Sequence, residues 1–258
     1  MKRRLGVNID HVATLREARQ VAYPDPVLVM PLLKEAAVDQ VTLHLREDRR
    51  HIQDRDLHEI IKMHVLPVNL EMALTEEMLA LAIKLKPANV TFVPEKREEL
   101  TTEGGLDAIK NLKTLKRAVT ALHDVGVRTS LFIDPDLQQV AATKETGALA
   151  IEIHTGAYCN LIEDFFNKEH HYNYKQQPAV AALVETEIKK IYAAAQNSHE
   201  AGIKVFAGHG LHKDNLDEIV KCELIEEYNI GHAIIARAIF VGMVQAVKEI
   251  QSVLANVR

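Results

Sequence analysis

Eight short apolar runs recur along the chain, and each ends at a polar residue. The runs have the length and β-branched content of buried parallel strands, and amphipathic stretches separate them. Eight strands alternating with helices predict an α/β fold, a single (β/α)8 TIM barrel with its site at the carboxyl ends of the strands. With their polar ends the runs are Val7–His11, Leu43–Arg46, Val68–Glu71, Thr91–Glu95, Leu131–Asp134, Ile151–His154, Val205–Gly210 and Tyr228–His232.

Local signals mark the starts of several helices. Asp25 before a proline, and Thr75 before two glutamates, are typical of helix N-caps. Asp134 also precedes a proline, so we expect it to cap a helix rather than act in catalysis. The chain has 258 residues, close to the roughly 250 of one such barrel, and no linker interrupts it. We therefore expect a single domain over residues 1–258.

Composition narrows the class of protein. The formal net charge of −5 argues against a nucleic-acid binder, which usually carries a basic excess. Cys159 and Cys222 have neither metal-ligand nor disulfide-framework spacing, as expected of reduced thiols. No apolar run is long enough to span a membrane, and polar residues interrupt any signal sequence at the N-terminus. A cytoplasmic location is the expectation.

Two segments depart from the plain alternation. The stretch Tyr158–Pro178 is rich in aromatic residues although the chain contains only 5% of them. It predicts an enlarged loop after strand six that serves as a subunit contact or a flap. The long polar stretch Glu95–Gly105 ends in two glycines, and we interpret it as a lid that excludes water from the site.

The polar strand ends supply acid–base groups. His44 and Arg46 lie two residues apart on one strand, so both side chains face the barrel lumen. Asn8 with Asp10, Asn69 with Glu71, and Glu152 with His154 repeat this spacing. Such a mixture of carboxylates and imidazoles suits several proton transfers near neutral pH without a metal. The rim contains Asp10, His11, His44, Glu71, Glu152, His154, His209 and His232.

Two regions favour anions. Gly208, Gly210 and Gly231 lie at the ends of strands seven and eight, the usual phosphate position in such barrels. The stretch Arg46–His51 supplies cations after strand two, where a second phosphate could bind; its alternative interpretation is a solvated loop of mixed charge.

Characteristic motifs occur along the whole chain: Gly6–His11, Ala13–Arg16 with Arg19, Tyr23–Pro26, His44–His51, Asn69–Met72, Val93–Arg97, Thr101–Gly105, Ser130–Asp134, Ile151–Gly156, Ala207–Gly210 and Asn229–Ala233. Together these motifs resemble the pyridoxine 5′-phosphate synthase family. The family's reaction joins 3-amino-2-oxopropyl phosphate to 1-deoxy-D-xylulose 5-phosphate, giving pyridoxine 5′-phosphate, inorganic phosphate and water without a cofactor or metal. The resemblance also implies a homo-octamer built from dimers.

The resemblance also implies residue roles. His44 and Glu71 would accept protons, His209 would donate one, and Glu152 would stabilise charge in the transition state. The family's arginine at the position of Arg19 can reach the site of a neighbouring subunit. The amino-ketone phosphate would contact Asn8, Arg19, Gly210, Gly231 and His232, and the deoxyxylulose phosphate Asp10, His11, Arg46, His51 and Thr101.

Three other functions compete with this one. A TIM-barrel phosphosugar isomerase or epimerase would share the phosphate sites but needs only one substrate. A metal-dependent hydrolase usually has His-x-His on the first strand, whereas Asp10 and His11 are adjacent here and cannot both face the lumen. A binding scaffold without turnover leaves the carboxylates of the rim unexplained.

Overall fold

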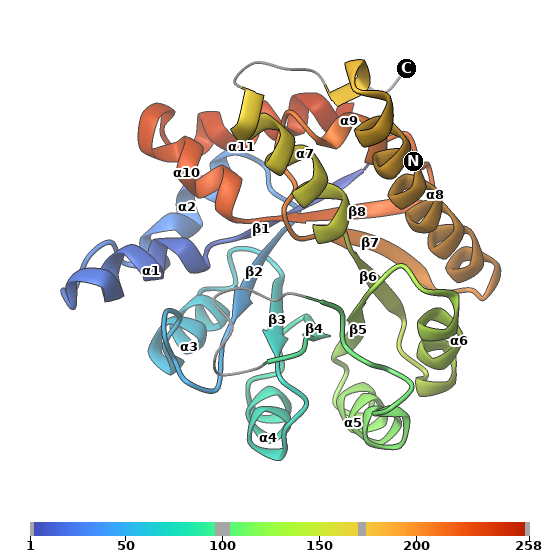
Figure 1. The fold of residues 1–258 in the computed structure, drawn as a ribbon. Coiled ribbons are helices and arrows are strands. Elements are labelled where there is room, and N and C mark those ends of the chain that lie inside the picture. The colour runs from blue at the N-terminus through green and yellow to red at the C-terminus, as the bar shows by residue number, and fades with distance from the viewer. Residues whose placement is uncertain (1–2, 96–103, 170–173, 256–258) are drawn as a thin grey trace.

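The computed structural model describes residues 3–95, 104–169 and 174–255, which form a closed barrel of eight strands surrounded by helices (Figure 1). Each strand pairs in parallel with the next in the chain, and β8 closes the barrel by pairing with β1. The predicted (β/α)8 barrel is therefore confirmed. The strands are β1 (Arg4–Asn8), β2 (Gln40–His44), β3 (Val68–Met72), β4 (Asn89–Phe92), β5 (Arg128–Ile133), β6 (Ala150–His154), β7 (Lys204–Gly208) and β8 (Ile225–Ile230).

Helices fill the connections between strands. The predicted caps at Asp25 and Thr75 are confirmed, because their side chains accept hydrogen bonds from the backbone N–H groups of Val27 and Met78. The helices are α1 (Asp10–Arg19), α2 (Met30–Glu35), α3 (Asp54–Met63), α4 (Glu76–Leu85), α5 (Leu112–Asp124), α6 (Leu137–Thr146), α7 (Gly156–Glu169), α8 (Pro178–Glu200), α9 (Leu216–Ile219), α10 (His232–Val241) and α11 (Met243–Ala255), with 3-10 turns η1 (Pro26–Val29) and η2 (Tyr174–Gln176).

The predicted cap at Asp134 is wrong. The N-cap of α6 is Asp136, whose carboxylate accepts hydrogen bonds from the N–H groups of Gln138 and Gln139. Asp134 lies at the end of β5 and contacts His154 with its Oδ1, 2.9 Å from the ring Nδ1. The proline therefore marks the turn before the helix, and Asp134 is available to the site.

The connection after β6 is enlarged, as expected, but most of it is helical. Helix α7 begins at Gly156, directly after β6, and η2 and α8 follow it. Tyr158 explains part of the aromatic content of this segment: its side chain is 1% exposed, and its hydroxyl donates a hydrogen bond of 2.6 Å to the Asn215 carbonyl. This aromatic residue packs within the subunit.

The barrel interior is polar, while the outward faces of the strands pack apolar residues against the helices. Gln40 on β2 reaches Glu227 on β8 with a hydrogen bond of 2.6 Å. Thr91 on β4 bonds to Asn69 and Ser130 on the neighbouring strands. These cross-strand bonds satisfy the buried polar groups, which would otherwise destabilise the fold. Within the described ranges, no helix is both long and apolar enough to cross a membrane.

Candidate active site

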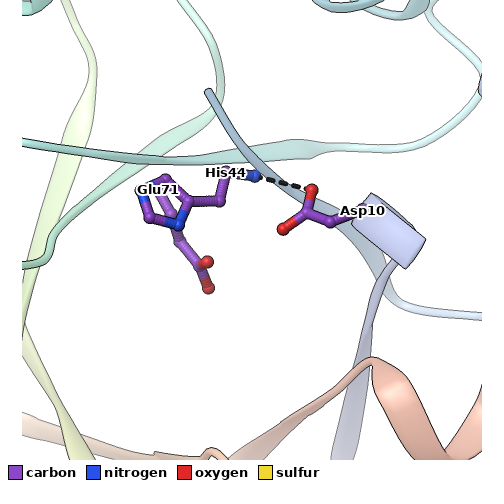
Figure 2. A group of neighbouring side chains, drawn as sticks. All are labelled: Asp10, His44 and Glu71. Atoms are coloured by element: carbon purple, nitrogen blue, oxygen red, sulfur yellow. Dashed lines mark hydrogen bonds between the residues drawn. The ribbon is translucent and has the colours of Figure 1, made fainter. Parts of the chain in front are cut away.

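Three side chains from consecutive units meet at the carboxyl end of the barrel (Figure 2). Asp10 opens α1, His44 ends β2 and Glu71 lies on β3. The backbone N–H of His44 donates a hydrogen bond of 2.9 Å to Oδ1 of Asp10. A ring nitrogen of His44 and carboxylate oxygens of Asp10 and Glu71 all lie within 4.8 Å of one another. The structure thus brings the two expected proton acceptors together.

The environment of Glu71 favours its neutral form. Burial raises the pKa of this carboxyl well above its usual value, the negative charges of Glu152 and Asp10 raise it further, and a hydrogen bond from Asn8 opposes them. A carboxyl shifted towards neutrality is suited to proton transfer near pH 7. Its ionised form is therefore a stronger base than the carboxylate of a surface glutamate.

Glu152 is more deeply buried, with 3% of its surface exposed. Asn229 on β8 donates a hydrogen bond of 2.8 Å to its Oε2, with only β7 between the two strands. Burial raises the pKa of Glu152, and the charge of Glu227 adds to this effect, against the Asn229 hydrogen bond. Gly208 makes room for this carboxyl, because a Cβ at position 208 would collide with Oε1 of Glu152.

His209 has a strained backbone, with φ of +75°, a conformation that non-glycine residues seldom adopt. Its ring centroid lies 4.9 Å from that of His154. Burial lowers the pKa of His209 to about 4, and the neighbouring His154 contributes. His209 is therefore a neutral imidazole near pH 7 in the free protein.

His154, which was expected in the rim, pairs beside His209 with Asp134, which sequence reasoning did not place in the site. His154 is 7% exposed, and its Nδ1 lies 2.9 Å from Oδ1 of Asp134. Its Nε2 is buried, and no described residue hydrogen-bonds to it. The same Asp134 oxygen accepts a hydrogen bond from the N–H of Gly105. The adjacent proline had suggested a cap and obscured this role.

Three of the residues expected around the first phosphate, Asn8, Gly231 and His232, converge at the start of α10. No side chain caps this helix, because its N-cap is Gly231. A Cβ at Gly231 would approach the Asn8 side chain to about 2.9 Å, so glycine permits this close packing. The rings of His11 and His232 meet edge to face with centroids 4.9 Å apart. An uncapped helix N-terminus between two imidazoles is suited to an anion.

Two of the residues expected around the second phosphate, Arg46 and His51, lie after β2. Arg46 is 4% exposed, and its Nε lies 3.4 Å from Oδ1 of Asp48. The His51 ring lies edge to face with His44, with centroids 6.1 Å apart, and its Nδ1 accepts the N–H of Ile52. Burial lowers the pKa of His51, although the charge of Asp10 opposes the shift. This region combines a buried guanidinium with an imidazole.

Three expected substrate contacts, Arg19, Gly210 and Thr101, are not part of the two groups described above. Arg19 is the last residue of α1, which runs outward from the barrel in Figure 1, and it is exposed. Gly210 has φ of +78° and packs against Cys159, close to His209. Thr101 and most of the predicted lid lie outside the described residues. Gly210 therefore lies beside His209, whereas Arg19 is exposed at the outer end of α1.

A cavity of about 200 Å³ lies at the opposite end of the barrel. Its lining includes Arg4, Gln40, Asn89, Arg128 and Lys204, the first residues of their strands. None of the expected site residues lines it, so this cavity is separate from the site at the carboxyl ends.

The fold and site define a class: a (β/α)8 barrel with an acid–base cluster between two regions suited to phosphate. The chain matches a protein family described as "Pyridoxal phosphate biosynthesis protein PdxJ", and the match covers residues 5–256. The chain belongs to this family.

The names of similar proteins agree with this family assignment. Pyridoxine 5′-phosphate synthase of Sulfurihydrogenibium sp. (strain YO3AOP1) is 49% identical over 258 residues, with 99% of each chain covered. The enzyme of that name from Aquifex pyrophilus is 47% identical, covering 95% of this chain and 99% of the relative. A solved Amycolatopsis orientalis BexX/CysO complex matches with a TM-score of 0.61, 14% identity, and coverage of 98% of this chain and 88% of that one, which supports the fold alone. The family and enzyme class expected from the motifs are confirmed.

Proposed function

We propose that the chain condenses 3-amino-2-oxopropyl phosphate with 1-deoxy-D-xylulose 5-phosphate to form pyridoxine 5′-phosphate, inorganic phosphate and water. The observation that carries the proposal is the cluster of Asp10, His44 and Glu71 at the same end of the barrel as two anion-suited regions. Curated relatives with 44–49% identity are named for this synthase. The chemistry needs several proton transfers, and the site supplies carboxyls and imidazoles for them.

The amino-ketone phosphate binds at the start of α10. Backbone N–H groups of the first helical turn and the positive end of the helix dipole meet the phosphate there. Glycines line this position because a side chain would occupy the space of Asn8 or Cys159. The residues proposed for it are Asn8, Gly210, Gly231 and His232, together with Arg19.

The deoxyxylulose phosphate binds after β2. Arg46 and His51 hold its phosphate and stabilise the charge that develops when phosphate leaves. Asp10 and His11 contact the sugar portion, and we retain Thr101 as a contact from the sequence resemblance. With both substrates in place, the sugar ketone faces the amine beside Glu71.

Bond formation proceeds through proton transfers between these groups. The amine condenses with the ketone to an imine and releases water, with Glu71 and His209 moving the protons. Phosphate then leaves, water adds to the resulting double bond, and carbon–carbon bond formation closes the ring. His44 removes a carbon-bound proton, and the loss of two further waters gives the aromatic product. Glu152 stabilises charge as these intermediates form.

His209 changes protonation state during this cycle. In the free protein it is neutral near pH 7, since burial lowers its pKa to about 4. A substrate phosphate nearby favours the imidazolium and raises that pKa. His209 therefore becomes a proton donor only in the substrate complex, so that the donor is generated where it is needed.

Arg19 completes the site of a second copy of the chain. It is exposed at the end of α1, which contacts η1 and α10. Exposed apolar side chains lie on these three elements and in the segment between α1 and η1: Leu15, Tyr23, Leu28, Ile239 and Phe240. Such a surface is suited to an interface between copies, in line with the homo-octamer built from dimers that the resemblance implies.

The decisive test incubates purified, chelator-treated protein with both substrates and follows pyridoxine 5′-phosphate by absorbance and mass. Product that requires both substrates supports the proposal. Interconversion of a single phosphosugar would instead support the isomerase or epimerase alternative.

Mixing inactive variants tests the role of Arg19. Arg19→Ala and His44→Ala subunits, unfolded together and refolded, should regain part of the activity, because some mixed dimers contain one intact site. No recovery from mixed oligomers would place Arg19 in the site of its own chain.

A further inference from the structure

Glu95 binds the proposed base His44 although it belongs to a different unit of the barrel. It lies three residues after the end of β4, and His44 ends β2, with β3 between them. Its Oε1 is 2.8 Å from Nε2 of His44, and its Oε2 accepts a hydrogen bond of 3.0 Å from the N–H of Glu47. The Glu95 side chain is only 5% exposed. Both carboxylate oxygens are thus used to hold the end of β2.

The charge of Glu95 decides which His44 nitrogen carries the hydrogen. Burial raises the pKa of Glu95, but the hydrogen bond and charge of His44, the Glu47 N–H and the charge of Arg46 outweigh it, so the pKa is lowered overall. An ionised carboxylate only accepts hydrogen bonds, so Nε2 of His44 must be the donor. In neutral His44 the lone pair then lies on Nδ1.

The remaining contacts of His44 fix its orientation. Its backbone N–H is bonded to Asp10, and its ring lies edge to face with His51. Among the described residues, none forms a hydrogen bond with Nδ1. The ring is therefore held at Nε2 and at the backbone, while Nδ1 is left for the substrate.

We propose that Glu95 is a positioning residue that fixes the tautomer and orientation of His44, so that Nδ1 acts as the base. This inference rests on the proposed function, because it assigns the atom through which His44 would act. A histidine held by a carboxylate recurs in enzymes where the imidazole must accept a proton at one nitrogen.

Kinetics of Glu95→Ala and Glu95→Gln test the proposal. Glu95→Ala should lower kcat on the order of 10- to 100-fold, as expected when the partner of a functional histidine is removed. KM should stay within about threefold, because Glu95 does not bind substrate. Glu95→Gln should lose less activity, because its amide oxygen can still accept from Nε2. Glu76→Gln, a surface carboxylate paired with Arg117, is the matched control.

A double variant separates positioning from an independent role. If Glu95 acts through His44, adding Glu95→Ala to His44→Ala should cause no further loss of kcat. Losses that multiply would overturn the proposal, as would unchanged kcat in Glu95→Ala or an effect confined to KM.

The tautomer can be measured without turnover. Solid-state ¹⁵N spectra of histidine-labelled protein, with the His44 signal assigned by its loss in His44→Ala, should show hydrogen on Nε2 in the wild type. Glu95→Ala should change this signal. Hydrogen on Nδ1 of neutral wild-type His44 would overturn the inference even if the protein makes no pyridoxine 5′-phosphate, whereas absent product alone would refute only the proposed function.

Discussion

Glu152→Gln isolates the protonation state of the buried carboxyl on β6. Burial raises the pKa of Glu152 above its ordinary value of 4.5. The folded protein therefore keeps this proton at pH values where the unfolded chain releases it. Stability is lost as pH rises from 4.5 towards the folded pKa. Glutamine has no proton to release, so the variant lacks this loss while it keeps the shape and an oxygen for Asn229.

The magnitude follows from proton linkage. Each pH unit across this window changes the free energy of unfolding by about 1.4 kcal/mol for one proton. From about pH 5 to about pH 7 the variant should thus gain up to about 2.7 kcal/mol relative to wild type. For a domain of this size that corresponds to roughly 5 °C or more in Tm. The gradient with pH is the informative quantity, because a constant offset reflects other contacts.

Urea or thermal unfolding of both proteins at several pH values measures this difference. His11, His51 and His209 also make the free energy of unfolding depend on pH. Their contributions are common to both proteins and cancel in the comparison. Glu76→Gln serves as the control. Its exposed ion pair with Arg117 lowers the pKa of Glu76, so this variant should gain no stability relative to wild type as pH rises. If the free energy of unfolding depends on pH in the same way for wild type and Glu152→Gln, Glu152 is ionised in the folded protein over this range. The argument from burial would then be refuted.

Three further predictions use the same site. His209→Asn should gain stability relative to wild type as pH falls from 6.5 towards about 4, because the lowered pKa makes protonation unfavourable in the folded state; acid unfolding curves that stay parallel contradict it. Gly208→Ala should displace the Glu152 carboxyl, lower kcat at least about tenfold and destabilise the fold by about 1–3 kcal/mol, measured by turnover and urea unfolding; unchanged values would mean that the barrel adapts. Chelation should leave turnover unchanged, and loss restored by one divalent cation would assign a metal to the Asp10 cluster.

The sequence was sufficient to predict the barrel because eight apolar runs alternate with amphipathic helical stretches, and each run ends at a polar residue. His44 and Glu71 could be found for the same reason, since both lie at the ends of apolar runs. The interior could not be predicted in this way. Buried Asn229 and Glu227 interrupt the last strand as polar residues, and only their partners on other strands explain their burial. Those pairings are set by the closure of the barrel.

Glu95 shows the limit of local patterns most clearly. It was visible as a polar strand end, but the charged stretch that follows favoured an assignment to a lid. Its contact with His44 spans 51 residues of sequence and passes over the whole of β3. Asp134 was misassigned in the same way, because a nearby proline suggested a cap while its partner His154 lies on the next strand. In both cases a carboxylate after one strand orients a histidine on another strand. A sequence search for site residues in this fold should therefore pair every carboxylate at a strand end with histidines at the ends of nearby strands.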